Sequence, residues 1–262
     1  MIRRDELLRR YDREMREDPV PLRGGRVERV GRLVRMVDGE NSVIYSHLND
    51  ADAPAAVAEE AEHFRALGQE VEWKVFGHDR PVGLEALLAA SGFAPDEPET
   101  LVVFDLERAF PAAGVPPDVD VRRVTESVGV RDASIASAAA FGPEKGRNAA
   151  RWAEFLHDPS QALFVAYAGA VPVACGRLEM TPGRSFAGLW GGGTAPAYRH
   201  RGIYRALLDA RADLARRQGY RFLTVDARAS SRPILERLGF VPLTSTRAWV
   251  LRPGAATARA AP

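Results

Sequence analysis

The most informative segment of the chain reads Gly191-Gly192-Gly193-Thr194-Ala195-Pro196-Ala197-Tyr198-Arg199-His200-Arg201-Gly202-Ile203-Tyr204-Arg205-Ala206-Leu207-Leu208. Apolar residues predict a strand over 186–193, and helical spacing predicts a helix over 203–218. The loop between them is basic. The first N–H groups of a helix have no partner within it and carry partial positive charge, so this helix start suits a pyrophosphate.

The pattern Arg-x-x-Gly is informative here only because of its position. Copies start at Arg65, Arg80, Arg199 and Arg216, and only the third lies between a predicted strand and a long predicted helix. There, glycine allows the backbone to approach a ligand closely, and the basic side chains add positive charge. The loop residues that we expect to bind the ligand are Arg199, His200, Arg201, Gly202, Ile203, Tyr204 and Arg205.

The order of strand and helix patterns predicts the fold class. Further strands are predicted over 27–36, 42–48, 71–76, 101–106, 119–124, 162–168, 171–180, 222–226 and 247–251. Further helices are predicted over 5–16, 54–67, 84–90, 128–141, 148–157 and 233–238. Helices inserted between strands in this way predict an α+β protein with one mixed sheet.

The chain also repeats itself weakly. Segment 87–95 parallels segment 234–242, each preceded by helix, glycine and strand, and each followed by a strand. A chance match is the alternative, because a helix end followed by glycine and an apolar residue is common. We expect a tandem pair of related half-domains: a first domain at 1–109, a linker at 110–118 and a second domain at 119–262.

Composition disfavours several function classes. The 36 basic and 35 acidic residues leave a formal net charge of +1, so no overall field marks a nucleic-acid or acidic-membrane binder. Cys175 is the only cysteine and the histidines lack metal-ligand spacing, so we expect no disulfide framework and no metal. The chain contains no run of about 18 apolar residues and no signal-peptide pattern. We therefore expect a cytoplasmic protein.

These features resemble the GNAT acyltransferase superfamily. Its pyrophosphate motif, Arg/Gln-x-x-Gly-x-Gly/Ala, is similar to residues 199–204, and segment 231–240 resembles its last conserved block. The resemblance covers residues 119–252. It implies a mostly antiparallel GNAT-type sheet flanked by helices, acetyl-CoA as co-substrate and an amine acceptor. The first half resembles a degenerate copy, because its corresponding loop, 48–52, is acidic and lacks arginine and glycine, so we expect it to be non-catalytic.

The resemblance places acetyl-CoA between strands 186–193 and 222–226, and it implies that Gly193, Thr194, Ala195, Ser230 and Ser231 also bind this ligand. The three glycines at 191–193 then permit a bulge whose N–H groups face a developing oxyanion, or they serve close packing. Direct attack on a thioester needs a base for the amine proton. Glu179 and Asp226 are the candidate bases, with a solvated strand-end carboxylate as the alternative for each, and Tyr204 is a candidate acid. Ser230 and Ser231 contact the ligand or cap the following helix.

Two residues depart from the family pattern. Tyr204 stands where the family has glycine or alanine, and Leu235 stands where many members place the tyrosine that protonates the thiolate. The alternative to an N-acetyltransferase is therefore a non-catalytic acyl-CoA-binding or interaction module. Nucleic-acid binding fits worst, because the charge is balanced. Cys175 is expected in the core, and the sequence leaves open which amine is the acceptor and whether the chain forms a homodimer.

Overall fold

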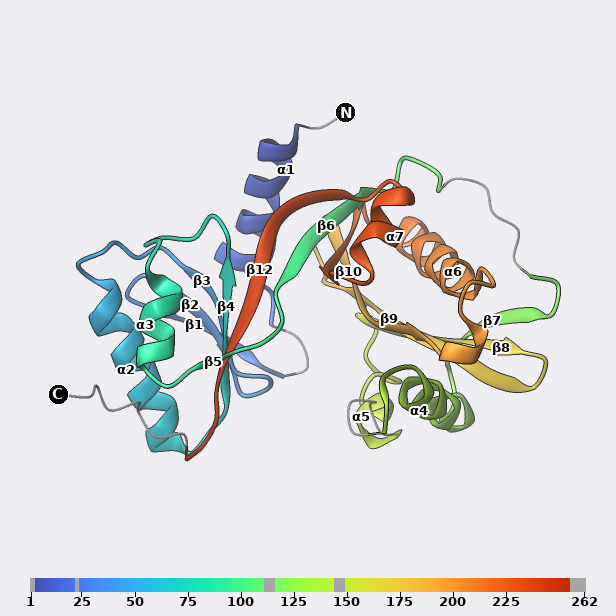
Figure 1. The fold of residues 1–262 in the computed structure, drawn as a ribbon, viewed down its shortest axis with the longest axis horizontal. Coiled ribbons are helices and arrows are strands. Elements are labelled where there is room, and N and C mark those ends of the chain that lie inside the picture. The colour runs from blue at the N-terminus through green and yellow to red at the C-terminus, as the bar shows by residue number, and fades with distance from the viewer. Residues whose placement is uncertain (1–2, 22–23, 111–115, 144–148, 255–262) are drawn as a thin grey trace. The chain divides into compact units, whose positions relative to one another are not determined.

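A computed structural model describes residues 3–21, 24–110, 116–143 and 149–254 of the chain (Figure 1). The chain groups into two compact units. Unit 1 comprises residues 1–102, 226–236 and 242–262, and unit 2 comprises residues 103–225 and 237–241. Each unit is thus built mainly from one half of the sequence but includes residues from the other half.

Unit 1 is a mixed sheet with helices on both faces. Its strands lie in the order β1-β2-β3-β4-β12, and β5 also pairs with β12. β3 and β4 are parallel, and the other pairs are antiparallel. Its elements are α1 (Arg4–Tyr11), a π-helical turn (Asp12–Glu17), β1 (Arg26–Val30), β2 (Leu33–Val37), β3 (Ser42–Ser46), α2 (Ala53–Leu67), β4 (Val71–Phe76), α3 (Leu84–Ala90), β5 (Ala94–Pro95) and most of β12 (Val241–Leu251).

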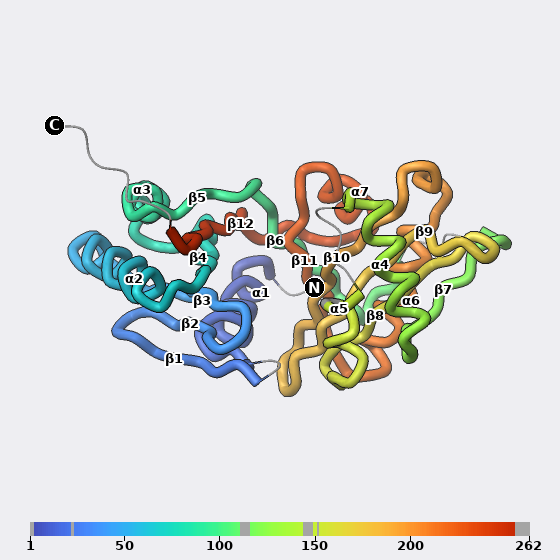
Figure 2. Tube along the Cα trace, turned by 90° about the horizontal axis from the view of Figure 1, so that it is seen from below, coloured from blue at the N-terminus to red at the C-terminus, as the bar shows by residue number. Residues whose placement is uncertain are grey.

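The two faces of the unit 1 sheet have different cover. α2 and α3 cover one face (Figure 2), where Val71, Trp73 and Val75 of β4 are buried in a shared core. On the opposite face, the ring of Phe76 lies 6.2 Å from that of Tyr11, measured between centroids. Strand alternation therefore sends every second residue of β4 toward the N-terminal helical segment.

Unit 2 has the same kind of construction. Its strands lie in the order β11-β10-β9-β8-β7. β10 and β11 are parallel, whereas β10 and β9, β9 and β8, and β8 and β7 are antiparallel. The elements are β7 (Val119–Arg123), α4 (Ser127–Phe141), α5 (Ala149–Ala153), β8 (Gln161–Ala168), β9 (Val171–Met180), β10 (Phe186–Thr194), α6 (Ile203–Arg217) and the first part of β11 (Phe222–Arg228). The rest of β11 and most of α7 (Arg232–Arg237) belong to unit 1.

Helices cover both faces of the unit 2 sheet as well. α4 and α5 pack on one face, where Trp152, Leu163, Val165 and Cys175 share a core (Figures 1 and 2). α6 packs on the other face. Its apolar residues are buried along a single stripe, as expected for an amphipathic helix on a sheet.

Each unit includes C-terminal residues of the other half. β12 belongs mainly to unit 1, where it pairs with β4 from Thr246 to Leu251. The end of β6 (Glu99–Asp105) and Leu106 belong to unit 2, where Leu106 N–H donates to Arg221 O at 2.9 Å. The two units therefore exchange C-terminal strand segments.

The predicted fold class, a mixed and mostly antiparallel sheet flanked by helices, is confirmed. Four element predictions were wrong in detail. The strand predicted over 27–36 is two strands, β1 and β2, joined by a turn at Gly31, whose φ is +57°. The last strand begins at Val241, the helix predicted over 148–157 ends at Ala153, and the helix over 5–16 changes to π-helical hydrogen bonding at Asp12.

The two consecutive domains at 1–109 and 119–262 stay a prediction. The compact units of the structure are instead each made of segments from both halves of the chain. Of the predicted linker 110–118, residues 111–115 lie outside the described residues. Phe110 packs in unit 2, with its ring 4.2 Å from that of Phe104.

Arg16 holds the π-helical turn to the unit 1 sheet. This side chain is buried, at 2 % exposure. Its guanidinium donates two hydrogen bonds to Asp79, at 2.6 and 2.8 Å, one to Asp12 at 2.7 Å and one to Ile44 O at 3.1 Å. It also lies 3.7 Å from the centroid of the Phe76 ring. The single guanidinium group of Arg16 makes all of these contacts.

We predict that Arg16→Ala destabilises the protein by about 3–5 kcal/mol, because the buried Asp79 carboxylate loses its cation. Chemical denaturation measures this loss. Arg13→Ala, an exposed arginine of the same turn, is the control and should change stability by less than about 0.5 kcal/mol. Equal losses in the two variants would contradict a structural role for Arg16.

Candidate functional site

The loop between β10 and α6 makes a compact turn in unit 2. After Thr194, a 3-10 turn (Pro196–Tyr198) leads to two left-handed residues, His200 with a φ of +63° and Gly202 with a φ of +80°. Gly202 directly precedes α6. Because glycine adopts this conformation without steric cost, Gly202 allows the sharp entry into the helix.

The start of α6 leaves backbone donors free. Within the described part of the chain, no hydrogen bond reaches the N–H groups of Arg201, Gly202, Ile203 or Tyr204, and no side chain caps the helix. Ala206 is the first residue whose N–H bonds back, to Gly202 O at 3.0 Å. These adjacent donors lie at the positive end of the helix and suit an anion.

The corresponding helix start in unit 1 is closed. The side-chain oxygen of Asn49 accepts hydrogen bonds from the N–H groups of Ala51, at 3.0 Å, and Asp52, at 2.8 Å. The Asn49 carbonyl accepts a third, from Ala53, at 3.0 Å. The start of α2 therefore lacks the open set of donors found at α6.

The arginines of the loop are engaged by protein groups. Arg199 Nε donates to Thr194 O at 3.1 Å, Arg201 pairs with Asp118 at 2.6 Å, and Arg205 pairs with Asp209 at 3.0 Å. The side chains of Arg201 and Asp118 are 42 % and 52 % exposed, so solvent screens that pair. An anion that binds the N–H groups can therefore compete with Asp118 for Arg201 at little cost.

The other predicted loop residues differ in what they can offer a ligand. Gly193, Ala195 and Ile203 are buried, which leaves only their backbone, and the side chain of His200 is exposed. Thr194 is 8 % exposed, and its Oγ1 has no hydrogen-bond partner among the described residues. Most buried hydroxyls are bonded, so Thr194 Oγ1 is an exception among the described residues.

The glycines of β10 have separate roles. The pairing of β10 with β9 shifts between Trp190 and Gly193, where the sequence predicted a bulge, and Gly191 has a φ of +56°. A Cβ on Gly193 would lie 2.5 Å from the Phe141 ring, so this glycine allows the close approach of α4. Both the bulge and the packing alternative are therefore realised, at different glycines.

Tyr204 points toward a buried cation. A Cβ on Gly192 would lie 3.4 Å from the Tyr204 ring and 3.3 Å from the Arg211 guanidinium. Arg211 is 1 % exposed, and its Nη2 has no partner among the described residues. Burial lowers the pKa of Arg211, and the Tyr204 hydroxyl opposes that shift. The Tyr204 ring therefore lies close to Gly192 of β10 and to the Arg211 guanidinium.

Glu179 belongs to a polar cluster on unit 2. Its Oε2 accepts hydrogen bonds from Arg177, at 3.0 Å, and from Gln161, at 3.3 Å. Arg177 also donates to Gln161 Oε1 at 2.7 Å and lies 4.6 Å from the centroid of the Phe155 ring. Glu179 Oε1 has no partner among the described residues and is left to accept a proton.

Asp226 lies in unit 1 and has both oxygens engaged. Its Oδ2 accepts from Lys74 Nζ at 2.5 Å, and its Oδ1 accepts from the Thr246 hydroxyl at 2.9 Å. Burial disfavours the Lys74 ammonium, but the charge of Asp226 outweighs it and raises the pKa of Lys74. This carboxylate is committed to a buried ion pair.

The remaining predicted residues also belong to unit 1. Ser230 is exposed. Ser231 directly precedes α7, and its carbonyl accepts hydrogen bonds from Ile234 at 3.0 Å and Leu235 at 3.1 Å. Its hydroxyl donates to Arg228 O at 3.2 Å. Leu235 is fully buried and apolar, so it offers no proton.

Among the described residues, no group of histidine, cysteine, aspartate and glutamate side chains could hold a metal ion. The described helices also include none that is long and apolar enough to cross a membrane.

Part of the chain is similar to a known family. Residues 132–240 match the model of the Acetyltransferase (GNAT) family. We call these residues the matched segment. The matched segment includes the open start of α6, Glu179 and Tyr204. No curated protein sequence matches the chain.

Solved structures show the same fold over nearly the whole chain. A GCN5-related N-acetyltransferase from Kribbella flavida is 16 % identical, with a TM-score of 0.68, over 94 % of this chain and 93 % of the other. A second, from Sphaerobacter thermophilus, is 19 % identical, with a TM-score of 0.60, over 95 % and 86 %. A tandem GNAT protein from the clavulanic acid biosynthesis pathway is 17 % identical, with a TM-score of 0.61, over 86 % and 79 %.

Three residues of the matched segment were missed by the sequence analysis: Gln161, Arg177 and Arg211. Arg177 interrupts an otherwise apolar strand, and Arg211 lies one helical turn from Leu207 on the apolar side of α6. A charged residue at a position that the periodicity assigns to the core was the available signal. Their partners come from distant segments, so the contacts themselves could not be derived from spacing.

We predict that the native protein does not react with a thiol reagent at pH 8 and that the unfolded protein shows one reactive thiol. Cys175 is fully buried, and burial raises the pKa of its thiol to about 12, so almost no thiolate is present. Spectrophotometric titration with a chromogenic disulfide measures both states. Rapid reaction of the native protein would show that this strand is accessible.

Proposed function

We propose that the matched segment is a GNAT acetyltransferase domain, which binds acetyl-CoA at the loop that opens α6 and transfers the acetyl group to an amine. The observation that carries this proposal is the set of free N–H groups at Arg201–Tyr204. The pyrophosphate would accept hydrogen bonds from these N–H groups, with Arg201 beside it. The contrasting closure of α2 by Asn49 supports a non-catalytic first half.

The residues of unit 2 support direct attack by the amine on the thioester. Glu179 Oε1 is the proposed acceptor for the amine proton, because Arg177 and Gln161 hold the other oxygen and fix the carboxylate. Asp226 is the weaker candidate, since Lys74 and Thr246 occupy both of its oxygens. The bulge in β10 is the proposed donor site for the developing oxyanion.

Tyr204 is the proposed acid for the leaving thiolate, because the family's usual tyrosine position holds the buried Leu235. The acceptor is an amine of unspecified class. The further expectations of a cytoplasmic protein without a metal, nucleic-acid or membrane partner remain part of this proposal.

The second candidate function is a non-catalytic acyl-CoA-binding or interaction module. Leu235 favours it, since an apolar buried side chain cannot protonate a thiolate. Both candidate functions require that acetyl-CoA binds at the loop between β10 and α6. Only a measurement of turnover distinguishes the two functions.

We predict that Gly202→Val weakens acetyl-CoA binding at least about tenfold, because branching at Cβ blocks the approach to several donors that bond a charged ligand. Isothermal titration calorimetry measures the affinity. Gly219→Val is the matched control: Gly219 follows the other end of α6, and its φ of +83° resembles the +80° of Gly202. The control variant carries similar backbone strain and should bind normally. Equal losses in both variants would remove the site assignment.

We predict that Glu179→Gln lowers kcat for amine acetylation by about 10²–10⁴ and leaves acetyl-CoA affinity unchanged, because the variant lacks the proton acceptor. Release of the CoA thiol in the presence of a panel of amines measures turnover. Glu126→Gln, at an exposed residue before α4, is the control. Binding of acetyl-CoA by the wild type without thiol release for any amine would favour the non-catalytic module.

A further inference from the structure

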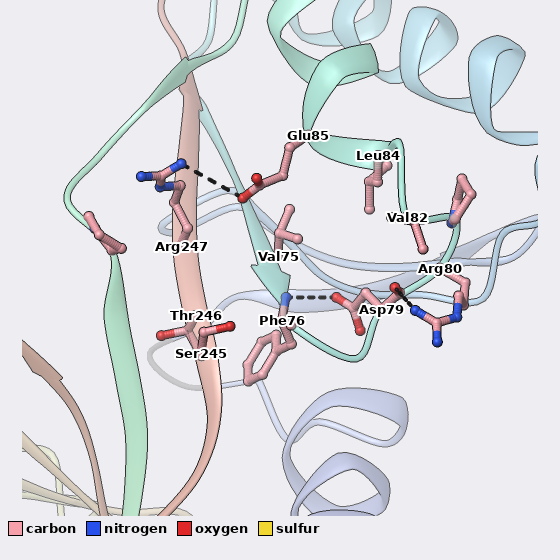
Figure 3. Close-up of a pocket in the computed structure, with 13 residues that line it drawn as sticks. Val75, Phe76, Asp79, Arg80, Val82, Leu84, Glu85, Ser245, Thr246 and Arg247 are labelled. Atoms are coloured by element: carbon pink, nitrogen blue, oxygen red, sulfur yellow. Dashed lines mark hydrogen bonds and ion pairs between the residues drawn. The ribbon is translucent and has the colours of Figure 1, made fainter.

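A hollow of about 370 Å³ lies in unit 1, between the end of β4, the start of α3 and β12 (Figure 3). The two carboxylates that line it already have partners in the protein. Asp79 accepts hydrogen bonds from Phe76 N–H, at 2.9 Å, and from Arg16, at 2.6 Å. Glu85 lies 4.0 Å from Arg247. The carboxylates of this hollow are therefore neutralised by the protein itself.

In unit 2, an exposed aromatic side chain lies beside the proposed base. Gly188 of β10 pairs directly with Glu179 of β9. Trp190 pairs with Arg177, two residues further along β10, so all four residues lie on one face of the sheet. A Cβ on Gly188 would lie 2.6 Å from the indole Nε1 of Trp190. The indole therefore occupies the place of a side chain at position 188, which makes it the cross-strand neighbour of Glu179.

Trp190 differs from the other tryptophans of the chain in its exposure. It is 40 % exposed, whereas Trp73, Trp152 and Trp249 are 5 % exposed or less. The chain contains four tryptophans, so Trp190 is the only one with a substantial part of its surface in solvent. An aromatic ring of this size has a large apolar area to remove from water, so a ligand that covers Trp190 gains affinity.

Trp190 also lies where β10 separates from β11. The two strands pair only from Phe186 to Gly188 of β10. The shift in pairing between β10 and β9, which forms the bulge, follows directly after Trp190. Residue 190 thus lies between the last residue that pairs with β11 and the bulge, which is the proposed donor site for the oxyanion. A ligand on Trp190 would therefore lie next to the proposed reaction centre.

Arg177 determines which part of a ligand suits the indole. Its guanidinium is buried and lies 5.7 Å from the centroid of the Trp190 ring and 4.6 Å from that of Phe155. This charge would repel a second cation on the Trp190 ring. It would not repel an uncharged aromatic group, and aromatic pairs are more stable than their buried area alone explains. A cationic amine is instead attracted by Glu179, whose Oε1 has no partner among the described residues.

We propose that Trp190 and Glu179 form the acceptor subsite, and that the acceptor is an amine attached by a short chain to an aromatic ring. The aromatic ring stacks on Trp190, and the ammonium group pairs with Glu179. Cross-strand Cβ atoms lie about 4.5–5.5 Å apart, a distance that a chain of about two carbon atoms bridges. The inference rests on the proposed function, because only acetyl transfer makes the bound amine an acceptor. Binding of the amine does not depend on that transfer.

Three compounds of similar size test the proposal on the full chain: 2-phenylethylamine, 2-cyclohexylethylamine and 2-phenylethanol. Isothermal titration calorimetry, with coenzyme A present and absent, measures their affinities. 2-Phenylethylamine should bind about two- to tenfold more tightly than the cyclohexyl amine, because only its ring is aromatic. The alcohol lacks the charge that pairs with Glu179 and should bind at least about tenfold more weakly than 2-phenylethylamine. Equal affinities of the two amines, or no binding of the aromatic amine under either condition, would overturn the proposal.

Variants locate the binding. Trp190→Leu should remove the preference for the aromatic amine over the cyclohexyl amine, and Trp190→Phe should retain it, because only phenylalanine keeps an aromatic ring. Glu179→Gln should weaken binding of the amines but not of the alcohol, because it removes the charge alone. Val128→Ala, at an exposed apolar residue of α4, is the control and should bind as the wild type does. An unchanged preference in Trp190→Leu would contradict the stacking role.

Fluorescence distinguishes a failure of this inference from a failure of the proposed acetyl transfer. Acrylamide should quench mainly the exposed Trp190, and 2-phenylethylamine should lower the quenching constant, because the bound ligand covers the indole. This measurement requires neither acetyl-CoA nor turnover. Protection of Trp190 without release of the CoA thiol would contradict acetyl transfer and support the subsite. Thiol release with 2-phenylethylamine but without protection of Trp190 would support acetyl transfer and overturn the subsite.

Discussion

Each unit depends on a pair of parallel strands whose pairing is very short. β3 and β4 pair at Ser42 and Val43, and β10 and β11 pair from Phe186 to Gly188. In each unit a helix must connect the two strands, because parallel strands cannot be joined by a tight turn. The helix therefore begins just beyond the carboxyl end of the first strand, with its positive end there. The loop between β10 and α6 and the β10 bulge lie along the first strand of such a pair or just after it.

The two units are built alike, but the starts of α2 and α6 differ in whether their backbone N–H groups have hydrogen-bond partners. Asn49 satisfies the donors before α2 with its own side chain and carbonyl, as an Asx turn does. Gly202 has no side chain and leaves the donors before α6 unsatisfied. The residue at the helix start therefore decides whether backbone N–H groups are left without partners there.

The sequence predicted the features that depend on residues close together in the chain. The loop between β10 and α6, the amphipathic α6 and the bulge at the three glycines followed from spacing and conformational preference. The hairpin at Gly31 was missed because a strand pattern continues on both sides of a two-residue turn. The Lys74–Asp226 pair, the Arg211 guanidinium beneath Gly192 and the exchange of C-terminal strands join distant segments, and a single sequence contains no signal for such partners.

The exchange of strands has a consequence for the order in which the protein can be completed during synthesis. β4 emerges from the ribosome long before β12, yet β12 supplies the neighbour to which β4 pairs from Val71 to Phe76. Until then the first half has an exposed strand edge, which is a template for pairing with other chains. The first half of the chain is synthesised first, but its sheet is complete only when β12, at the end of the second half, has been made.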